Sequence, residues 1–245
     1  MYRYMMVTAI IVAGGKGSRF ALSKSKPLES EPPKQFLMLG DTPVLGHSLL
    51  TFDKNTYIDR IILVVPKEYL MLCEDMVLQL GLQKPCEVII GGNNRQESVC
   101  NGLLSLEEGC MDGIVLVHDG ARPFVDAEDI DALLSETYEH NAATLGLPVT
   151  DCLKIANFDM SIQQTLQRDN IFTIQTPQAF KAELLIKAHK KARDIGGSKL
   201  WYDDCQLVEN LGYSPKIVAG NPRNIKITHA MDMIIARSVL EGEDI

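Results

Sequence analysis

Short runs of apolar residues predict the strands of a buried sheet. Residues 8–12 and 60–65 are almost continuously aliphatic, and residues 113–117 repeat the pattern. Residues 87–90 and 216–218 form shorter runs of the same kind. Continuous apolar runs of this length, in contrast to alternating ones, are typical of parallel strands that are covered on both faces.

Stretches with helical periodicity lie between these runs. Acidic residues open the segment 127–140, and Asp126 stands directly before it as an expected helix cap. The alternation of strands and helices predicts an α/β fold, in which helices cover both faces of a mostly parallel sheet. We therefore expect a single Rossmann-like domain over residues 1–245. The predicted helices cover residues 44–52, 69–80, 96–107, 127–140, 181–193, 203–211 and 230–240.

Residues 149–168 interrupt this rhythm and predict a β-hairpin. Two segments of alternating polarity flank a turn-like Asn-Phe-Asp at residues 157–159, as in an antiparallel pair of strands. The apolar content of these segments is too small to bury a hairpin by itself. We therefore expect the hairpin to pack against another surface.

The composition excludes several classes of protein. The chain has 245 residues, 46% of them hydrophobic, and 24 basic against 32 acidic side chains give a net charge of −8. This balance does not favour a nucleic-acid or membrane-surface partner, which would require a basic face. No apolar run reaches the ~20 residues that span a bilayer. The six cysteines form no C-x-x-C pair, which favours free thiols in a reducing compartment and predicts a cytoplasmic protein.

A glycine-rich loop follows the first predicted strand and carries Ala13, Gly14, Gly15, Gly17 and Arg19. Glycines let backbone N–H groups approach phosphate oxygens closely. The loop fits neither the P-loop nor the dinucleotide-binding pattern, and a tight strand-to-helix turn would also explain its glycines. Arg19 favours a phosphate site, because a guanidinium can hold phosphate oxygens through two hydrogen bonds.

Two further polar turns follow predicted strands. Gly92 and Asn93 come after one strand, and Asp119 and Gly120 come after another. Ligands of parallel α/β sheets bind at the carboxyl ends of the strands, so the three turns are expected at one edge of the sheet. Asn93 or Asn94 would cap the next helix, and the free N–H groups there suit phosphate or the polar edge of a base.

Charged side chains near these turns supply candidate ligands. Asp119 is costly to bury without a partner, and that partner could be a metal ion or Arg122. Arg95 is expected to bridge neighbouring loops as a structural residue, and His118 is expected to pack in the core. Lys34 lies in a Pro-Lys-Gln segment that apolar neighbours would anchor, which makes it a candidate phosphate ligand.

Two more cations lie later in the chain. Arg168 ends the predicted hairpin, and Lys226 stands between Ile225 and Ile227. Alternation places Lys226 on the face opposite its two apolar neighbours. The residue pattern alone leaves open whether these two cations are surface charges or ligands.

Six motifs, taken together, resemble those of the 2-C-methyl-D-erythritol 4-phosphate cytidylyltransferase family. The resemblance extends from Ala9 to about Leu240. It implies the glycosyltransferase-A-like fold of nucleotidyltransferases and the transfer of CMP from CTP to methylerythritol phosphate, with release of pyrophosphate and with Mg²⁺. The motifs are Ala-Gly-Gly-x-Gly-x-Arg at 13–19, Pro-Lys-Gln at 33–35, Gly-Gly-x-x-Arg-x-x-Ser-Val at 91–99, Val-His-Asp-Gly-Ala-Arg-Pro at 117–123, Gln-Thr-Pro-Gln-Ala-Phe at 175–180 and Asn-Ile-Lys-Ile-Thr at 224–228.

The resemblance implies a role for each matching residue. Arg19 and Lys34 would stabilise negative charge on the triphosphate, and Arg168 and Lys226 would hold the attacking phosphate. Asp119 would be a candidate Mg²⁺ ligand. The acceptor site would be lined by Asp119, Arg122, Cys152, Thr176 and Tyr202. The cytidine and its phosphates would be surrounded by Ala13, Gly14, Gly15, Gly17, Gly92, Asn93, Ser98 and Gly120.

The predicted hairpin resembles the dimerisation arm of the same family. The resemblance implies a homodimer in which each arm carries Arg168 into the active site of the partner subunit. A partner surface would also explain why the hairpin lacks enough apolar residues to be buried by one chain.

Two positions on the acceptor side differ from the family pattern. Cys152 stands where the family has threonine, and Tyr202 stands where it has a small hydroxyl side chain. Two alternatives therefore remain: a cytidylyltransferase for another polyol phosphate, such as ribitol 5-phosphate, and a nucleotide-binding regulatory protein without turnover. Retention of all four cations favours an enzyme, since binding alone would not require them all.

Overall fold

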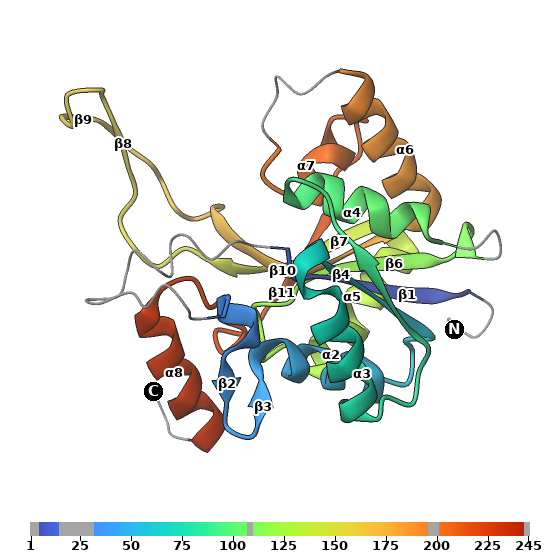
Figure 1. The fold of residues 1–245 in the computed structure, drawn as a ribbon. Helices are drawn as coiled ribbons and strands as arrows, with labels where there is room; N and C mark the ends of the chain where they lie inside the picture. The colour runs from blue at the N-terminus through green and yellow to red at the C-terminus, as the bar shows by residue number, and fades with distance from the viewer. Residues whose placement is uncertain (1–4, 15–31, 107–109, 196–200, 243–245) are drawn as a thin grey trace.

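The computed structural model describes residues 5–14, 32–106, 110–195 and 201–242. Its centre is a seven-stranded sheet with the strand order β11-β7-β10-β6-β1-β4-β5 (Figure 1). These strands are β1 (Val7–Val12), β4 (Arg60–Val65), β5 (Cys86–Ile90), β6 (Ile114–Asp119), β7 (Ala142–Pro148), β10 (Phe172–Lys181) and β11 (Lys216–Ala219).

Strand directions place the ends of the central strands at one edge of the sheet. β10 runs antiparallel to both of its neighbours, β6 and β7, whereas the other neighbouring pairs are parallel. In the register of β1 with β6, Val12 lies opposite Asp119, and in that of β1 with β4, Val12 lies opposite Val64. The prediction of an α/β fold with a mostly parallel sheet is confirmed.

Helices cover both faces of the sheet (Figure 1). Helices α2, α3 and α5 bury residues such as Phe52, Cys73 and Leu133 against one face, and α4, α6 and α7 bury residues such as Val99 and Leu185 against the other. In the described part of the chain, no helix is both long and apolar enough to cross a membrane. The helices are η1 (Lys34–Phe36), α2 (Val44–Lys54), η2 (Lys67–Tyr69), α3 (Leu70–Leu80), α4 (Arg95–Leu104), α5 (Ala127–His140), α6 (Ala182–Asp194), α7 (Asp204–Glu209) and α8 (Ala230–Glu241).

Helix α8 forms a small third layer at one end of the molecule. It packs on a two-stranded ribbon, β2 (Met38–Leu39) and β3 (Thr42–Pro43). Its buried Met233 and Ala236 share a cluster with Leu39 and Ile227. This cluster anchors the segment that carries Lys226, because Ile227 is fully buried in it.

The predicted hairpin forms an arm that projects away from the sheet (Figure 1). Its strands, β8 (Lys154–Ala156) and β9 (Ile162–Thr165), pair antiparallel with each other, and their residues are exposed. Phe158 and Met160 at its tip are exposed as well. The described residues of this chain therefore leave the arm exposed and do not provide the surface against which it was expected to pack.

The other predicted elements are confirmed with shifted ends, but two neighbouring strands of the large sheet, β7 and β10, were not predicted. The prediction for Asp126 is partly wrong. Asp126 occupies the position before α5, yet its carboxylate makes no capping bond. It accepts a hydrogen bond from Asn221 at 2.5 Å instead, which ties the start of α5 to the loop after β11.

Candidate active site

Three turns meet where β1, β5 and β6 end. Ala13 and Gly14 follow β1, Gly92 lies just past β5, and Gly120 follows β6. A Cβ on Gly120 would lie 3.4 Å from the Cβ of Ala13, and one on Gly14 would lie 3.5 Å from Oγ of Ser98. The expected convergence of the three turns is therefore confirmed for the residues that the structure describes.

The turn after β5 is fixed by the first turn of α4. Oγ of the buried Ser98 accepts a hydrogen bond from the Gly92 amide at 3.1 Å and donates to the Asn94 carbonyl at 2.8 Å. Of the two expected caps, Asn94 is the one that accepts from the Glu97 amide, while Asn93 donates to the Glu97 carboxylate. A Cβ at Gly92 would approach Cβ of Glu97 to 2.2 Å, so this turn requires glycine.

Asp119 is the charged centre of the cluster. Its Oδ1 accepts from Nε of Arg95 at 3.0 Å, and its Oδ2 accepts from Nζ of Lys226 at 2.5 Å. Burial opposes ionisation, but the charges of Arg95 and Lys226 outweigh it and hold the pKa of Asp119 well below its usual range. Arg122, one of the two candidate partners, acts on Asp119 only through its charge, because its guanidinium donates to the carbonyl of Asn224 at 2.7 Å.

Neutral hydrogen bonds hold the turn behind Asp119. Nε2 of His118 lies 3.0 Å from the Arg122 carbonyl, which can only accept, so Nε2 carries the proton. Nδ1 then accepts from the Thr176 hydroxyl at 3.3 Å, and that hydroxyl accepts from the Asp119 amide at 3.0 Å. Burial lowers the pKa of His118 to about 4. His118 is thus a neutral core residue, as expected from the sequence.

Lys34 and Lys226 come from two segments that touch. The Lys34 ammonium donates to the carbonyl of Ile227, the residue after Lys226. The neighbouring Gln35 is buried, and its amide donates to the Ala13 carbonyl at 2.7 Å. The Pro-Lys-Gln segment is therefore anchored beside the glycine turn, as predicted, and brings Lys34 toward the same edge of the sheet.

Sequence reasoning missed a second buried acid, Asp204. Asp204 is 1% exposed; its Oδ2 accepts from Arg95 at 2.6 Å, and its Oδ1 lies 3.0 Å from Nε2 of His189. Arg95 therefore bridges Asp119 and Asp204, in line with its expected structural role. The paired acids at the start of α7 were the available signal: Asp203 caps the helix, which leaves Asp204 to point inward.

Six predicted site residues are not part of this described cluster. Arg168 is exposed near the base of the arm, where its guanidinium donates to the carbonyl of Thr150. Cys152 is exposed in the same arm, and Tyr202, which is 79% exposed, lies in the turn before α7. The remaining three, Gly15, Gly17 and Arg19, lie outside the described residues.

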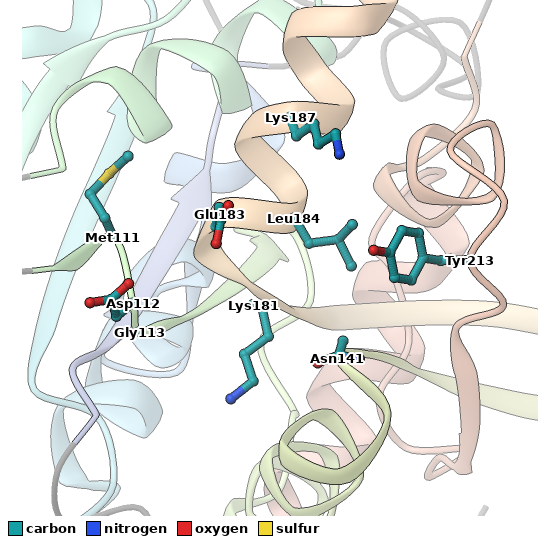
Figure 2. A pocket seen from close by; sticks show the side chains of 9 residues that line it. All are labelled: Met111, Asp112, Gly113, Asn141, Lys181, Glu183, Leu184, Lys187 and Tyr213. Atoms are coloured by element: carbon teal, nitrogen blue, oxygen red, sulfur yellow. The ribbon is translucent and has the colours of Figure 1, made fainter.

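A pocket of about 350 Å³ lies at the opposite edge of the sheet (Figure 2). Gly113 before β6, Asn141 before β7 and Lys181 at the end of the antiparallel β10 line it. Lys187 and Tyr213, labelled in Figure 2, line it as well. None of the predicted site residues that the structure describes lines this pocket, which is separate from the described part of the candidate active site.

The acids of the cluster do not form a metal site by themselves. Within the described ranges, no group of three or more His, Cys, Asp or Glu side chains is placed to hold a metal ion. Both oxygens of Asp119 already accept hydrogen bonds from cations. The donor set therefore fits a magnesium ion that brings most of its oxygen ligands from a nucleotide, with Asp119 as one added ligand.

The fold and the site define a class of protein. A mostly parallel α/β sheet whose carboxyl edge carries glycine turns, two lysines and a buried acid has the architecture of a nucleotide-binding protein. The family model described as IspD, 2-C-methyl-D-erythritol 4-phosphate cytidylyltransferase, matches residues 7–242. The chain belongs to this family.

Individual relatives agree with the family match. The chain is 40% identical over 235 residues to the 2-C-methyl-D-erythritol 4-phosphate cytidylyltransferase of Alkaliphilus metalliredigens, with 96% of this chain and 92% of the relative covered. The crystal structure of 4-diphosphocytidyl-2C-methyl-D-erythritol synthase from Anaerococcus prevotii is 28% identical, with a TM-score of 0.83 and 98% of each chain covered. The crystal structure of 2-C-methyl-D-erythritol 4-phosphate cytidylyltransferase from Thermus thermophilus is 29% identical, with a TM-score of 0.74 and coverage of 97% and 100%.

Proposed function

We propose that this chain transfers CMP from CTP to 2-C-methyl-D-erythritol 4-phosphate in isoprenoid biosynthesis. The products are 4-diphosphocytidyl-2-C-methyl-D-erythritol and pyrophosphate. Family membership supports the cytidylyl transfer. The structural observation that carries the chemistry is the meeting of Lys34, Lys226 and Asp119 beside the glycine turns.

The reaction needs charge neutralisation more than proton transfer. A phosphate oxygen of the acceptor attacks the α-phosphorus of CTP, and the bond from that phosphorus to pyrophosphate breaks. The nucleophile is already an anion at neutral pH, so no general base is required. Fixed cations that hold two anions in line and neutralise the developing charge supply the rate enhancement.

Each cation takes one part of this work. Lys34 and Arg19 neutralise the triphosphate, and Lys226 and Arg168 hold the attacking phosphate. The ion pair with Asp119 limits the positions that the Lys226 ammonium can take, and Arg95 holds the other oxygen of that carboxylate. The Lys226 ammonium is thereby positioned before the substrates bind.

The remaining site residues form two subsites. The glycine turns lack side chains that would keep the nucleotide away, and the neutral hydrogen-bonded turn around Thr176 supports the acceptor side. The nucleotide subsite comprises Ala13, Gly14, Gly15, Gly17, Gly92, Asn93, Ser98 and Gly120. The acceptor subsite comprises Asp119, Arg122, Cys152, Thr176 and Tyr202.

The site would hold a magnesium ion together with CTP. The cation offsets triphosphate charge and orients its oxygens when it is bound. Asp119 is the residue of the cluster that would hold it, and Lys34 and Lys226 would flank it.

The functional unit is a homodimer with shared active sites. The arm exposes Ile155, Phe158, Met160 and Ile162 in this chain, and apolar side chains gathered on one projection favour burial against a partner. Arg168 follows β9 at the base of the same arm. Each arm would therefore deliver Arg168 to the site of the partner subunit.

Pyrophosphate release tests the proposed function. Purified protein with CTP and Mg²⁺ is supplied with methylerythritol phosphate, with ribitol 5-phosphate or with no acceptor. We expect turnover with methylerythritol phosphate alone. Turnover with ribitol 5-phosphate alone would overturn the assignment of the acceptor, and CTP binding without turnover on either acceptor would identify a regulatory nucleotide-binding protein instead.

A further inference from the structure

A chain of alternating charges runs from the interior of the molecule to Lys226. The side chain of Asp204 is 1% exposed, and its carboxylate accepts from Nη1 of Arg95 at 2.6 Å. Nε of Arg95 donates to Oδ1 of Asp119 at 3.0 Å, and Oδ2 of Asp119 accepts from Lys226 at 2.5 Å. Lys226 is the most exposed member, with 34% of its side chain accessible. The most deeply buried charge is thus connected, through two others, to a lysine at the candidate active site.

Asp204 is held as an anion in a fixed position. Nε2 of His189 lies 3.0 Å from its Oδ1, and its backbone amide donates to the side-chain oxygen of Gln178 at 3.1 Å. Burial opposes ionisation, but the Arg95 charge and the His189 contact outweigh it and lower the pKa of Asp204 below its usual range. Asp204 therefore anchors Nη1 of Arg95 in one place.

One edge of the Arg95 guanidinium is only half used. Nε and Nη2 form this edge, and together they can hold both oxygens of a single carboxylate. In the described part of the chain, Nε donates to Asp119, while the buried Nη2 has no hydrogen-bond partner. The second oxygen of Asp119 is left to Lys226. Arg95 and Lys226 are therefore competitors for Oδ2 of Asp119.

We propose that Asp204 is a positioning residue for Lys226. By holding Nη1 of Arg95, it keeps Oδ2 of Asp119 available to the lysine. Without the Asp204 charge, Arg95 turns its Nε–Nη2 edge to Asp119 and takes both oxygens, and Lys226 loses the partner that orients it. The attacking phosphate is then held less well. This last step rests on the proposed function, whereas the competition for Asp119 does not.

Competitive acetylation of amines tests the pairing of Lys226 in the absence of substrates. A paired ammonium gives up its proton less readily and reacts more slowly, so Lys226 should be acetylated at least ~5-fold faster in Asp204→Asn than in the wild type. Lys216, at the exposed start of β11, is the internal reference for peptide mass spectrometry. Asp53→Asn removes another buried acid, one that accepts from the amides of a distant loop, and should leave the Lys226 rate unchanged. An unchanged Lys226 rate in Asp204→Asn would overturn the proposal.

Steady-state kinetics tests the consequence for the reaction. Asp204→Asn should raise the KM for methylerythritol phosphate by roughly 10-fold and leave the KM for CTP within about 2-fold of the wild-type value. In a Lys226→Met background, the same change should cause no further loss of kcat/KM, because the lysine that Asp204 positions is gone. An equal loss in both backgrounds, or an equal rise in both KM values, would show a merely structural role for Asp204.

A second variant keeps the test decisive if Asp204→Asn does not fold. Combining it with Arg95→Gln removes both charges of the buried pair and leaves neither of them unpaired. The competitor for Asp119 is then absent, so Lys226 should be acetylated at a rate within about 2-fold of the wild type. Fast acetylation of Lys226 in this double variant would refute competition by Arg95.

The two measurements separate this proposal from the proposed function. Wild-type protein that turns over no acceptor would refute the cytidylyl transfer, yet faster acetylation of Lys226 in Asp204→Asn would still support the positioning. Turnover by the wild type together with an unchanged Lys226 rate in the variant would refute the positioning alone.

Discussion

The ammonium of Lys226 lies 2.5 Å from Oδ2 of Asp119, although the two residues are 107 positions apart in the chain. Arg95 holds the other oxygen of the same carboxylate. One buried acid therefore positions two cations at the edge where three strands end. A lysine held in this way has fewer rotamers to lose when a phosphate arrives, because its place is set before binding.

Replacement of Lys226 should damage catalysis more than stability. Lys226→Met keeps most of the apolar stem but removes the charge, so kcat/KM should fall by roughly 100-fold. Lys216→Met on the exposed start of β11 should leave it unchanged. Steady-state pyrophosphate release and thermal unfolding on both variants measure the two effects. A Lys226→Met protein with near-normal kcat/KM would contradict the role of this lysine.

Replacement of Lys34 should lower kcat. Lys34→Ala removes a cation beside the glycine turn, and kcat should fall by about 100-fold or more while the fold stays intact. The exposed Lys67 in η2 gives the matched variant, Lys67→Ala. Circular dichroism checks the fold, and a kcat close to that of the wild type would refute charge stabilisation by Lys34.

Arg168 should act across a dimer interface. Arg168→Ala and Lys226→Ala are each expected to be nearly inactive. After subunit exchange between them, about a quarter of the sites would carry both native side chains, since half of the random dimers are mixed and one site in each is intact. Activity of the mixture, measured after exchange has been verified by mass spectrometry, reports this recovery. If Arg168 served its own subunit, mixing would restore nothing.

His118 should make the fold sensitive to acid. Burial lowers its pKa to about 4 in the native state, whereas the unfolded chain binds the proton near pH 6.5. Stability from this group is present above pH 6.5 and is lost as the pH falls toward 4. The difference corresponds to about 3 kcal/mol. Urea unfolding at pH 7 and at pH 4.5 measures the loss.

The variant His118→Gln provides the comparison for this effect. Its amide replaces one hydrogen bond but does not titrate, so its loss of stability between the two pH values should be smaller than that of the wild type. His189 works in the opposite direction, because its raised pKa contributes stability at low pH that is lost as the pH rises. An identical pH dependence in wild type and His118→Gln would therefore exclude His118 as the cause.

The sequence predicted the helices and most strands of the sheet but missed the two neighbouring strands β7 and β10. β10 buries Gln175, Thr176 and Gln178, so its pattern is polar where buried strands are usually apolar. Gln178 is tolerated there because its amide donates to Asp203 at 2.8 Å and its oxygen accepts from the amide of Asp204 at 3.1 Å. Such partners come from distant segments, and no local pattern reveals them.

The candidate site, too, was only partly predictable from the sequence. The turns were predictable, because glycines after apolar runs mark the carboxyl ends of strands. The partners of Asp119 were not, since Arg95 and Lys226 reach it from other segments while the nearby Arg122 turns to Asn224. Charge complementarity across the fold decides such pairs, and sequence proximity is a poor guide to them.

The arm begins and ends on neighbouring strands of the sheet. Phe172 of β10 pairs with Pro148 of β7, and the Ile171 carbonyl accepts from the Val149 amide at 2.9 Å. The two ends of the arm are thus held together by the sheet itself, independently of the arm. The length and the tip of such an arm could therefore change between relatives while the sheet kept its register.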